Sequence, residues 1–290
     1  MRNIFVTGGT GTWGQEIVKQ LLERKRTKKI IVYSRAERSQ EYMKRKVKDT
    51  RVEYILGDVK DYHRVKRSMR GCDTVIHTAA IKAVPNMEKD CYNGYKTNID
   101  GTNNVVQASV ANGVKRFVFI STDKAVDPIN AYGVSKAAAE HIVKQAARDY
   151  PKTKFRIVRS GNVLGSSSSV LQIWEESLKE YNKIKVTVPE MTRFYLTKSE
   201  AVRGLWEALK GKSLLYPNLG KYATLETLSR AAVTLWGDES SEVEIIGNRG
   251  GEKLHEQILS VYDGSPRDVY SCDTQEYTVD ELVEIIREEV

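Results

Sequence analysis

Four residues on a short stretch of the chain have types and spacing suited to acid–base chemistry. Tyr132 and Lys136 are four residues apart, which places both side chains on one face of a helix. A neighbouring ammonium lowers a phenol's pKa from its reference of about 10, so this pair predicts a tyrosinate base. Asp123 and Lys124 lie just upstream and offer a second carboxylate and a second amine. Their alternative role is an ion pair or a turn cap where a strand ends.

The spacing alone does not single out Tyr132. Five other tyrosines also have a lysine four residues on, namely Tyr42, Tyr62, Tyr92, Tyr150 and Tyr181. Only Tyr132 follows an apolar strand that ends in Ser121 and Thr122 and then opens a helix. The context therefore selects Tyr132 and Lys136 from the six pairs.

A glycine-rich loop, TGGTGTWG, connects the first predicted strand to the first predicted helix. Gly8, Gly11 and Gly14 allow a tight turn, close approach of the backbone to a pyrophosphate, and packing of the helix on the strand. The helix N-terminus then offers free N–H groups to the anion. This arrangement predicts a dinucleotide site rather than a plain turn, and we include Thr10 and Thr12 of the same loop in it.

The end of the second strand indicates which dinucleotide binds. An NAD site usually has an acidic residue about 20 residues after the last glycine, where it binds the ribose hydroxyls. Here the strand ends in Ser34 and Arg35, with Arg38 soon after. Arginine suits a 2′-phosphate, so the sequence predicts NADP. The alternative is that Arg35 is only an exposed turn residue.

Two further strand ends supply candidate cofactor contacts. Asp58 and Val59 follow the third strand and are expected to bracket the adenine. Ala79 and Ala80 follow the fourth strand, where small residues let the backbone approach the dinucleotide. Both assignments depend on position in the predicted fold.

Strands and helices alternate through the first two-thirds of the chain. Near-continuous apolar runs, typical of a buried parallel sheet, predict strands at 3–7, 29–33, 52–56, 73–77, 116–120 and 155–159. Helical periodicity falls at 16–24, 61–70, 99–112 and 131–148, and later at 170–181, 198–209, 224–236 and 279–288. A flexible loop is predicted at 166–169, and Thr278 with Glu281 predicts a capping box for the last helix.

This alternation predicts an α/β fold with a doubly wound parallel sheet of Rossmann type. We place this NADP-binding domain at residues 1–160, with 194–212 returning to it. The less regular remainder, 161–290, is too short for a second such unit. It is expected to form a smaller α/β lobe that binds substrate.

The composition is that of a soluble globular protein, with 40% hydrophobic and 29% charged residues. The 46 Lys and Arg outnumber the 38 Asp and Glu, giving a net charge of +8. Much of the excess lies in two patches, 24–29 and 44–48. Such patches are usually solvated faces, and no nucleic-acid motif accompanies them. We therefore expect no nucleic-acid partner.

No apolar run approaches the roughly 20 residues that span a bilayer, so no membrane partner is expected. The chain starts directly with a strand and the glycine loop, which predicts no signal or transit peptide. Cys72, Cys91 and Cys272 form no CxxC pair and are odd in number. They favour reduced thiols in a cytoplasmic protein. The four histidines have no metal-ligand spacing, so no metal is expected.

Taken together, these motifs resemble those of the extended short-chain dehydrogenase/reductase family. The glycine loop, the HTAA segment, the Ser-Thr strand end and the Tyr-x-x-x-Lys pair all match its pattern. Within that family the chain is similar to the inverting UDP-N-acetylglucosamine 4,6-dehydratases. The segments that carry this similarity are AAIKAVP, KTNIDGTNNV, STDKAVDPINAYGVSK, SGNVLGS, PEMTRF and GGEKLHE.

The resemblance implies a reaction. Tyr132, assisted by Lys136 and Thr122, takes the proton of the C4 hydroxyl as hydride passes to NADP⁺. The 4-keto group acidifies the proton at C5, which Lys124 removes while Asp123 protonates the departing C6 hydroxyl. Hydride returns to C6, so a tightly bound NADP is regenerated in each turnover. Reprotonation of C5 from the opposite face inverts that centre.

The resemblance also implies how a UDP-N-acetyl-hexosamine substrate is held. Asn162 is expected to hydrogen-bond the diphosphate or the sugar. Arg193 and Arg249 are candidate clamps for the pyrophosphate, since guanidinium pairs bidentately with phosphate oxygens. Lys82 and Glu252 are candidates for sugar and ribose contacts. For each of these residues the alternative is an ordinary surface charge.

Two other functions fit parts of the same pattern. A nucleotide-sugar 4-epimerase would use Tyr132 and Lys136 and leave Asp123 and Lys124 as bystanders. A non-catalytic NADP-binding regulator, or a nucleic-acid partner exploiting the positive charge, would not need the intact catalytic pair. Family members commonly pair through two helices, here 99–112 and 131–148, so at least a homodimer is expected.

Overall fold

The computed structural model describes residues 1–167 and 169–290, and the chain divides into two compact units. The first contains Met1–Arg159 and Val202–Tyr216, and the second contains Ser160–Ala201 and Pro217–Val290. The predicted loop at 166–169 includes Ser168, which lies outside the described residues.

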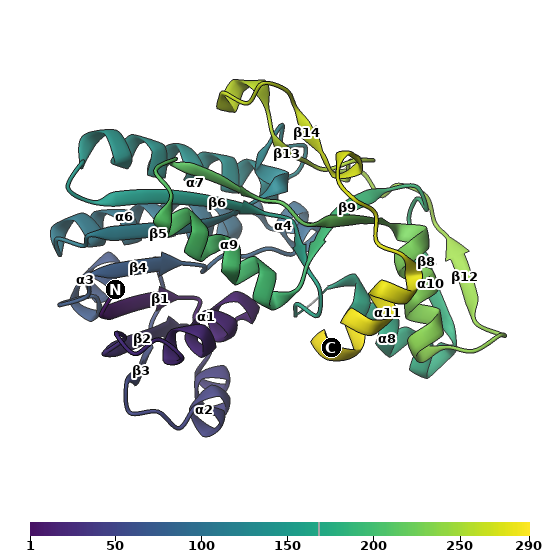
Figure 1. Cartoon of the computed structure of the whole chain (residues 1–290), viewed down its shortest axis with the longest axis horizontal. Coiled ribbons are helices and arrows are strands. Elements are labelled where there is room, and N and C mark those ends of the chain that lie inside the picture. The colour runs from purple at the N-terminus through teal and green to yellow at the C-terminus, as the bar shows by residue number, and fades with distance from the viewer. Residues whose placement is uncertain (168) are drawn as a thin grey trace. The chain divides into compact units, whose positions relative to one another are not determined.

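A seven-stranded sheet forms the centre of the first unit (Figure 1). Its order is β10-β6-β5-β4-β1-β2-β3. Four neighbouring pairs, β3 with β2, β2 with β1, β1 with β4 and β4 with β5, are parallel. The strands are β1 (Asn3–Thr7), β2 (Lys29–Ser34), β3 (Val52–Leu56), β4 (Thr74–His77), β5 (Arg116–Thr122), β6 (Lys154–Ser160) and β10 (Leu215–Asn218). The predicted doubly wound α/β fold is confirmed.

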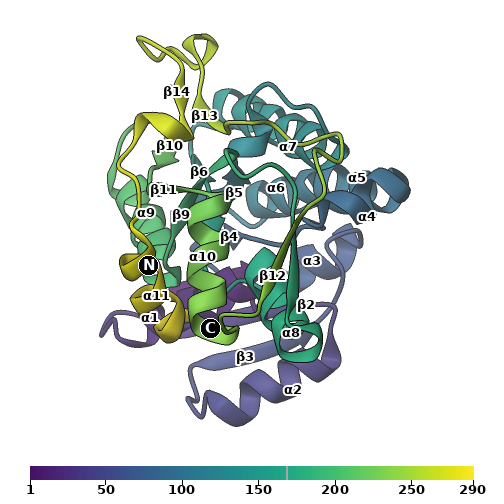
Figure 2. The same ribbon diagram turned by 90° about the vertical axis from the view of Figure 1, so that its right-hand side faces the viewer.

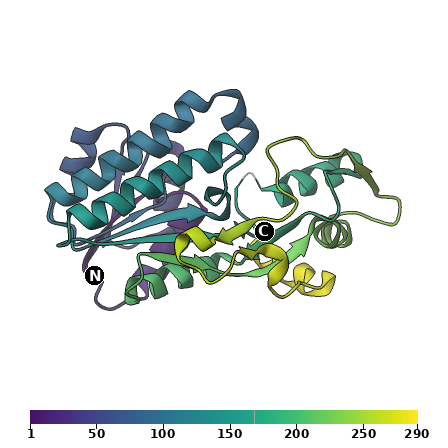
Figure 3. The ribbon, with the colours of Figure 1, turned by 90° about the horizontal axis from the view of Figure 1, so that it is seen from above.

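Helices cover both faces of this sheet (Figure 3). Alternate strand residues explain the two layers: Phe5 and Phe117 pack in one apolar cluster, whereas Ile4 and Val118 pack in the other. The helical elements are α1 (Thr12–Leu22), α2 (Glu37–Lys46), α3 (Tyr62–Ser68), α4 (Val84–Lys89), α5 (Cys91–Tyr95), the π-helix η1 (Lys96–Asp100), α6 (Gly101–Ala111), the 3₁₀ turn η2 (Asp123–Ala125), α7 (Ala131–Asp149) and α9 (Lys198–Lys210). α3, α6 and α7 contribute to the first cluster, and α1, α2 and α9 to the second.

The second unit is built from small sheets and three helices. Its strands are β7 (Asn162–Val163), β8 (Lys183–Val186), β9 (Thr192–Leu196), β11 (Lys221–Thr224), β12 (Glu242–Ile245), β13 (Gln257–Leu259) and β14 (Val269–Tyr270). Its helices are α8 (Val170–Tyr181), α10 (Leu225–Trp236) and α11 (Val279–Glu289), with 3₁₀ turns η3 (Val261–Asp263) and η4 (Ser271–Asp273). α8, α10 and α11 share one apolar cluster, and β13 and β14 form a separate ribbon (Figure 2).

Local sequence signals set several helix starts. Asp61 and Asn130 accept hydrogen bonds from backbone N–H groups in the first turns of α3 and α7. The predicted capping box of Thr278 and Glu281 opens α11. Such caps satisfy N–H groups that have no partner within the helix.

None of the helices in the described part of the chain combines the length and apolar composition needed to cross a bilayer. Across residues 1–167 and 169–290, no three His, Cys, Asp or Glu side chains gather as a metal site would require.

Candidate active site

The candidate active site lies where β5 ends and α7 begins. Asn130 caps α7 by accepting from the Gly133 backbone N–H at 2.8 Å. A Cβ on Gly133 would lie 2.2 Å from the Lys124 carbonyl oxygen. Only glycine therefore allows the first turn of α7 to approach η2 this closely, and this contact fixes Tyr132 relative to Lys124.

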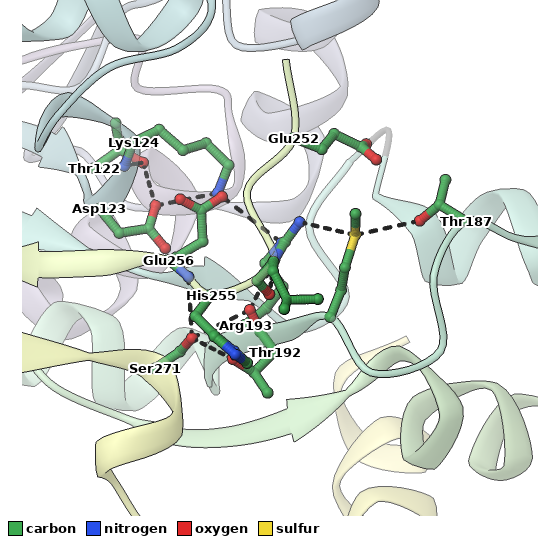
Figure 4. Close-up of polar contacts among 12 residues, drawn as sticks. Thr122, Asp123, Lys124, Thr187, Thr192, Arg193, Glu252, His255, Glu256 and Ser271 are labelled. Atoms are coloured by element: carbon green, nitrogen blue, oxygen red, sulfur yellow. Dashed lines mark hydrogen bonds and ion pairs between the residues drawn. The ribbon is translucent and has the colours of Figure 1, made fainter. Parts of the chain in front are cut away.

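Thr122, Asp123 and Lys124 form a hydrogen-bonded group at the strand end (Figure 4). The Thr122 hydroxyl donates to Asp123 Oδ1 at 2.8 Å, and Lys124 Nζ donates to the same oxygen at 3.1 Å. The Asp123 side chain is fully buried, whereas that of Lys124 is 17% exposed. The acid is therefore held in place, and the amine lies at the edge of the solvent.

Tyr132 belongs to the same group, but its pKa differs from the sequence expectation. Burial raises the pKa of the Tyr132 phenol to about 12, and Asp123 adds to the rise. Lys124 and a hydrogen bond with Thr122 act in the opposite direction. The expectation that Lys136 lowers this pKa is thus wrong for the protein alone, because the cation acting on the phenol is Lys124 and burial outweighs it.

Lys136 is directed toward the sheet. Its Nζ donates to the Ile120 carbonyl oxygen at 2.6 Å and lies 4.0 Å from the centre of the Phe119 ring. Burial lowers the pKa of Lys136 to about 7, while Glu140 opposes this shift. The buried amine therefore gives up its proton more readily than an exposed lysine does.

One residue of the site escaped the sequence reasoning. Asn98 is 1% exposed and lies in the π-helix η1, where the predicted helix 99–112 has an irregular start. Its side chain exchanges two hydrogen bonds with the backbone of Ile81 and donates to Ser135 Oγ at 2.9 Å. It thereby ties α7 to the segment after β4. The only sequence signal of this role was an asparagine within KTNID, at the start of a helical segment.

The glycine loop has the geometry that a dinucleotide requires. Gly8 has φ of +64°, and a Cβ there would lie 2.7 Å from Thr78 Oγ1 and 2.8 Å from the Ala79 nitrogen. A Cβ on Gly14 would lie 2.4 Å from Gly9 Cα. The loop therefore packs tightly on the ends of β1 and β4, and α1 starts at Thr12 with Gly11 of the loop as its N-cap. These residues fit a pyrophosphate.

Cations gather where β2 and β3 end. Arg35 Nη1 and Lys60 Nζ both lie 3.6 Å from Asp58 Oδ2. Arg38 is exposed on α2, and the buried Ser34 accepts a hydrogen bond from Gln40. Lys60 was not among the predicted residues, although its place after the third strand could have suggested it.

The remaining predicted cofactor residues differ in accessibility. Val59 is buried in the core against Gly101, whose added Cβ would lie 2.6 Å from it. The Ala79 N–H donates to Thr7 Oγ1 at 3.3 Å, and Ala80 is half-buried beside it. Thr10 accepts through its carbonyl from Gln15 at 2.8 Å, which orders the loop.

In the second unit, Arg193 is buried rather than free on a surface. Its Nε lies 3.7 Å from Glu256 Oε1, and Nη1 donates to the Thr192 carbonyl at 2.8 Å. Nη2 contacts the Met191 sulfur at 3.4 Å (Figure 4). The guanidinium is thus already bound to a carboxylate and to a backbone carbonyl, whereas a phosphate clamp was expected to have its N–H groups available for the ligand.

The other predicted substrate residues lie in two places. Asn162 starts β7, which pairs with β9, and Lys82 is exposed after β4 in the first unit. Arg249 is exposed in the loop after β12. Glu252 Oε2 is buried and finds no hydrogen-bond partner among the described residues. A buried carboxylate oxygen of this kind is suited to accept from a ligand hydroxyl.

Comparison with known proteins places this chain in a family. A family model described as polysaccharide biosynthesis protein matches residues 4–274, and the chain belongs to that family. It is 37% identical over 268 residues to the inverting UDP-N-acetylglucosamine 4,6-dehydratase of Campylobacter jejuni, a match covering 90% of this chain and 78% of the relative.

Two other matches extend this picture. The chain is 33% identical over 266 residues to a UDP-glucose 4-epimerase of Rickettsia bellii, covering 89% of this chain and 78% of the relative. The X-ray structure of Pen from Bacillus thuringiensis aligns with a TM-score of 0.90 and 30% identity, covering 99% of this chain and 97% of the other. The resemblance drawn from the sequence motifs is confirmed.

Proposed function

We propose that the protein is an NADP-dependent UDP-N-acetylglucosamine 4,6-dehydratase that inverts C5. The observation that supports this most strongly is the group of Asp123, Lys124 and Thr122, bonded together beside Tyr132. It offers an acid and an amine in addition to the tyrosine. A dehydration needs both, because one proton must leave C5 and one must reach the departing C6 hydroxyl.

Each residue has a defined task in this proposal. Bound nicotinamide supplies a hydride acceptor for C4 and a hydride donor for C6. Tyr132 must first lose its own phenol proton, because burial raises its pKa to about 12. Lys136, with its pKa lowered to about 7 and on the same face of α7, is the proposed acceptor, and the tyrosinate then takes the proton of the C4 hydroxyl. Lys124, in its neutral form, removes the C5 proton. Asp123, in its protonated form, delivers a proton to the C6 oxygen, so that water leaves.

The preference for NADP is supported by the charges at the ends of β2 and β3. Arg35 and Lys60 both lie 3.6 Å from Asp58 Oδ2, Arg38 follows on α2, and the second strand supplies no acid for the ribose hydroxyls. Asp58 holds two of these cations in place. A doubly charged phosphate would gain bidentate contacts from arginine there.

A UDP-sugar 4-epimerase is the second candidate, because a relative with that name is 33% identical to the chain. An epimerase must release and re-accept hydride at C4 only. The burial of Asp123 and its direct bond to Lys124 favour the dehydratase. Burying a carboxylate costs free energy and is retained more readily where it serves chemistry.

One incubation separates these functions. The purified protein is mixed with UDP-N-acetylglucosamine in deuterated water and the product is analysed by mass spectrometry and NMR. The dehydratase gives loss of water, deuterium at C5 and an inverted C5 centre. An epimerase gives a product of unchanged mass inverted at C4, and a non-catalytic regulator gives neither.

We further propose at least a homodimer, formed through α6 and α7. Both helices belong to the catalytic unit, so pairing would stabilise the helix that carries Tyr132 and Lys136. Light scattering at micromolar concentration tests this, and a monomer would contradict it.

A further inference from the structure

We propose that the amino-terminal edge of the seven-stranded sheet is a docking surface for an anionic phospholipid bilayer. By "the amino edge" we mean the six connections that lead into the strands, each counted from the end of a helix to the start of the next strand and called a turn below. They lie at 23–29, 44–51, 66–73, 111–116, 148–154 and 210–214. The contact is peripheral and electrostatic, and it revises the expectation of no membrane partner. It is independent of the proposed reaction.

Backbone hydrogen bonds place these turns side by side. They form a continuous series across the sheet: Ile30 N–H to Arg51 O, Lys28 N–H to Arg2 O, Asp73 N–H to Asn3 O, Lys115 N–H to Asp73 O, and Lys154 N–H to Lys115 O, at 2.8–3.0 Å. In Figure 3 the strands of the first unit run away from the side marked N. With neighbouring strands about 4.8 Å apart, the seven-stranded sheet, which continues past β6 to β10, extends over roughly 30 Å.

The charge of this edge is strongly one-sided. The six turns contain twenty Lys and Arg but only four Asp and Glu, an excess of sixteen, whereas the whole chain carries +8. The rest of the chain is therefore net negative. Seventeen of the twenty cations are exposed. The two basic patches noted in the sequence are thus parts of one larger surface.

The opposite edge of the same sheet has no excess of basic residues, so the charge of the amino edge does not come from a general enrichment in lysine. The turns that follow the strands, at 8–11, 35–38, 57–61, 78–90 and 123–130, contain six cations and seven acids. If the basic residues served only solubility, the two edges would not need to differ. The segregation indicates that the amino edge meets a partner of negative charge.

The shape and composition of the edge favour a bilayer over a nucleic acid. Among the six turns, aromatic residues are limited to Tyr150, which is half-buried, so bases find no stacking platform. The helices α2, α3, α6, α7 and α9 contribute only their last residues to this edge, so none lies along it as a recognition helix lies in a groove. A flat array of lipid phosphates can meet a row about 30 Å long at many points, at about 1 kcal/mol per Lys or Arg near the surface.

This orientation keeps the catalytic edge accessible. The strands are five to seven residues long along β1, β3 and β5. At about 3.3 Å per residue, the site at Thr122 lies roughly 20 Å from the docked edge. A bilayer bound at one end of the sheet therefore leaves the other end open to a soluble nucleotide sugar.

The test is cosedimentation of the full-length protein with vesicles. One set is phosphatidylcholine alone, and the other contains about a third phosphatidylglycerol. We expect binding to the anionic vesicles only, with release in roughly 1 M salt, where the Debye length falls to about 3 Å. The triple variant Lys25→Glu/Lys48→Glu/Lys152→Glu should lower the partition coefficient by about 100-fold or more.

A matched control separates the edge from total charge. Arg230→Glu/Arg267→Glu/Arg287→Glu makes the same charge change on exposed residues of the second unit and should bind like the parent. Lys28→Glu/Arg70→Glu/Lys212→Glu repeats the edge test if the first variant does not fold. The proposal is overturned if the parent ignores anionic vesicles, if neutral vesicles bind equally, if the control loses as much binding, or if duplex DNA displaces the vesicles at physiological salt.

Discussion

Arg159 and Glu140 form a buried bidentate ion pair that joins β6 to the catalytic helix α7. Arg159 Nε lies 2.8 Å from Glu140 Oε1, and Nη2 lies 2.7 Å from Oε2. The two side chains are 4% and 2% exposed. Glu140 is one helical turn beyond Lys136, on the same face of α7 as Tyr132, so the pair fixes the helix face that carries the catalytic residues.

Removing one partner of this pair should be costly. We expect Glu140→Gln to lower the free energy of unfolding by about 3–5 kcal/mol, because the guanidinium of Arg159 is then buried without its counter-charge. The double variant Glu140→Leu/Arg159→Met should recover most of that loss. Urea unfolding at neutral pH measures both. Equal stability of parent and Glu140→Gln would show that the pair does not support α7.

The buried His77 should make the protein sensitive to acid. His77 Nδ1 lies 2.6 Å from Thr7 Oγ1, and Nε2 lies 3.0 Å from Thr102 Oγ1. Burial, with a smaller effect of Lys136, lowers the pKa of His77 to about 3 from 6.5. Between these values the unfolded chain binds the extra proton, so stability falls as pH drops below about 6.5, by up to about 1.4 kcal/mol per pH unit.

His77→Asn removes this titration. Its stability at neutral pH should be lower than that of the parent, but it should decline less steeply between about pH 6.5 and pH 4. Urea unfolding of both proteins across that range gives the two slopes. The other titrating groups are common to both proteins, so parallel slopes would show that His77 contributes nothing to the acid response and is not held neutral in the folded state.

Cofactor preference should depend on Arg35. In Arg35→Asp the 2′-phosphate loses a cation and meets a carboxylate, while an unphosphorylated ribose gains an acceptor for its hydroxyls. We expect the ratio of the NADP(H) and NAD(H) dissociation constants to reverse or become flat, as measured by titration. Arg70→Asp, an exposed change at the amino edge, should leave the ratio intact. An unaltered ratio in Arg35→Asp would show that Arg35 does not recognise the 2′-phosphate of NADP.

The sequence predicted what depends on local pattern. The glycine loop, the strand ends and the cap of α11 follow from spacing and residue type, and the structure has them where expected. The role of Asn98 was missed, because it lies in a single turn of π-helix, a rare variant that α-helical periodicity does not predict. The pKa of Tyr132 was mispredicted, because burial is a property of the packed fold rather than of the four-residue spacing.

Contacts between distant segments of the second unit could not be predicted from the sequence. The sequence made Arg193 a candidate pyrophosphate clamp, with an ordinary surface charge as the alternative. In the structure Glu256, more than sixty residues later, is its ion-pair partner. Likewise, Thr192 meets His255 and Ser271 through hydrogen bonds of 2.8 Å and 2.6 Å (Figure 4). Such pairings join residues far apart in the chain and carry no local signal, so propensity and spacing cannot supply them.

The role of Lys124 can be separated from that of Tyr132. In Lys124→Ala, proton transfer from the C4 hydroxyl to Tyr132 should continue at a reduced rate, because the cation that lowers the phenol's pKa is lost. Loss of water and solvent exchange at C5 should fall much further, by about 10²–10⁴. Asp123 keeps its hydrogen bond from Thr122 in this variant, so the acid remains in place. The expected signature is substrate-dependent NADPH absorbance without a 6-deoxy product. In Tyr132→Phe, absorbance and product should fall together.

A further variant, Lys124→Arg, compared with Lys124→Ala, tests the ion-pair alternative for Asp123 and Lys124. If Lys124 only neutralises the buried carboxylate, then Lys124→Arg should preserve the charge, the fold and the activity. If Lys124 is the C5 base, Lys124→Arg should retain stability but lose C5 exchange, because a guanidinium does not deprotonate in this pH range. Deuterium incorporation at C5, followed by NMR beside urea unfolding, distinguishes the two outcomes. Exchange at the parent rate in Lys124→Ala would make Lys124 structural and require another base for the elimination.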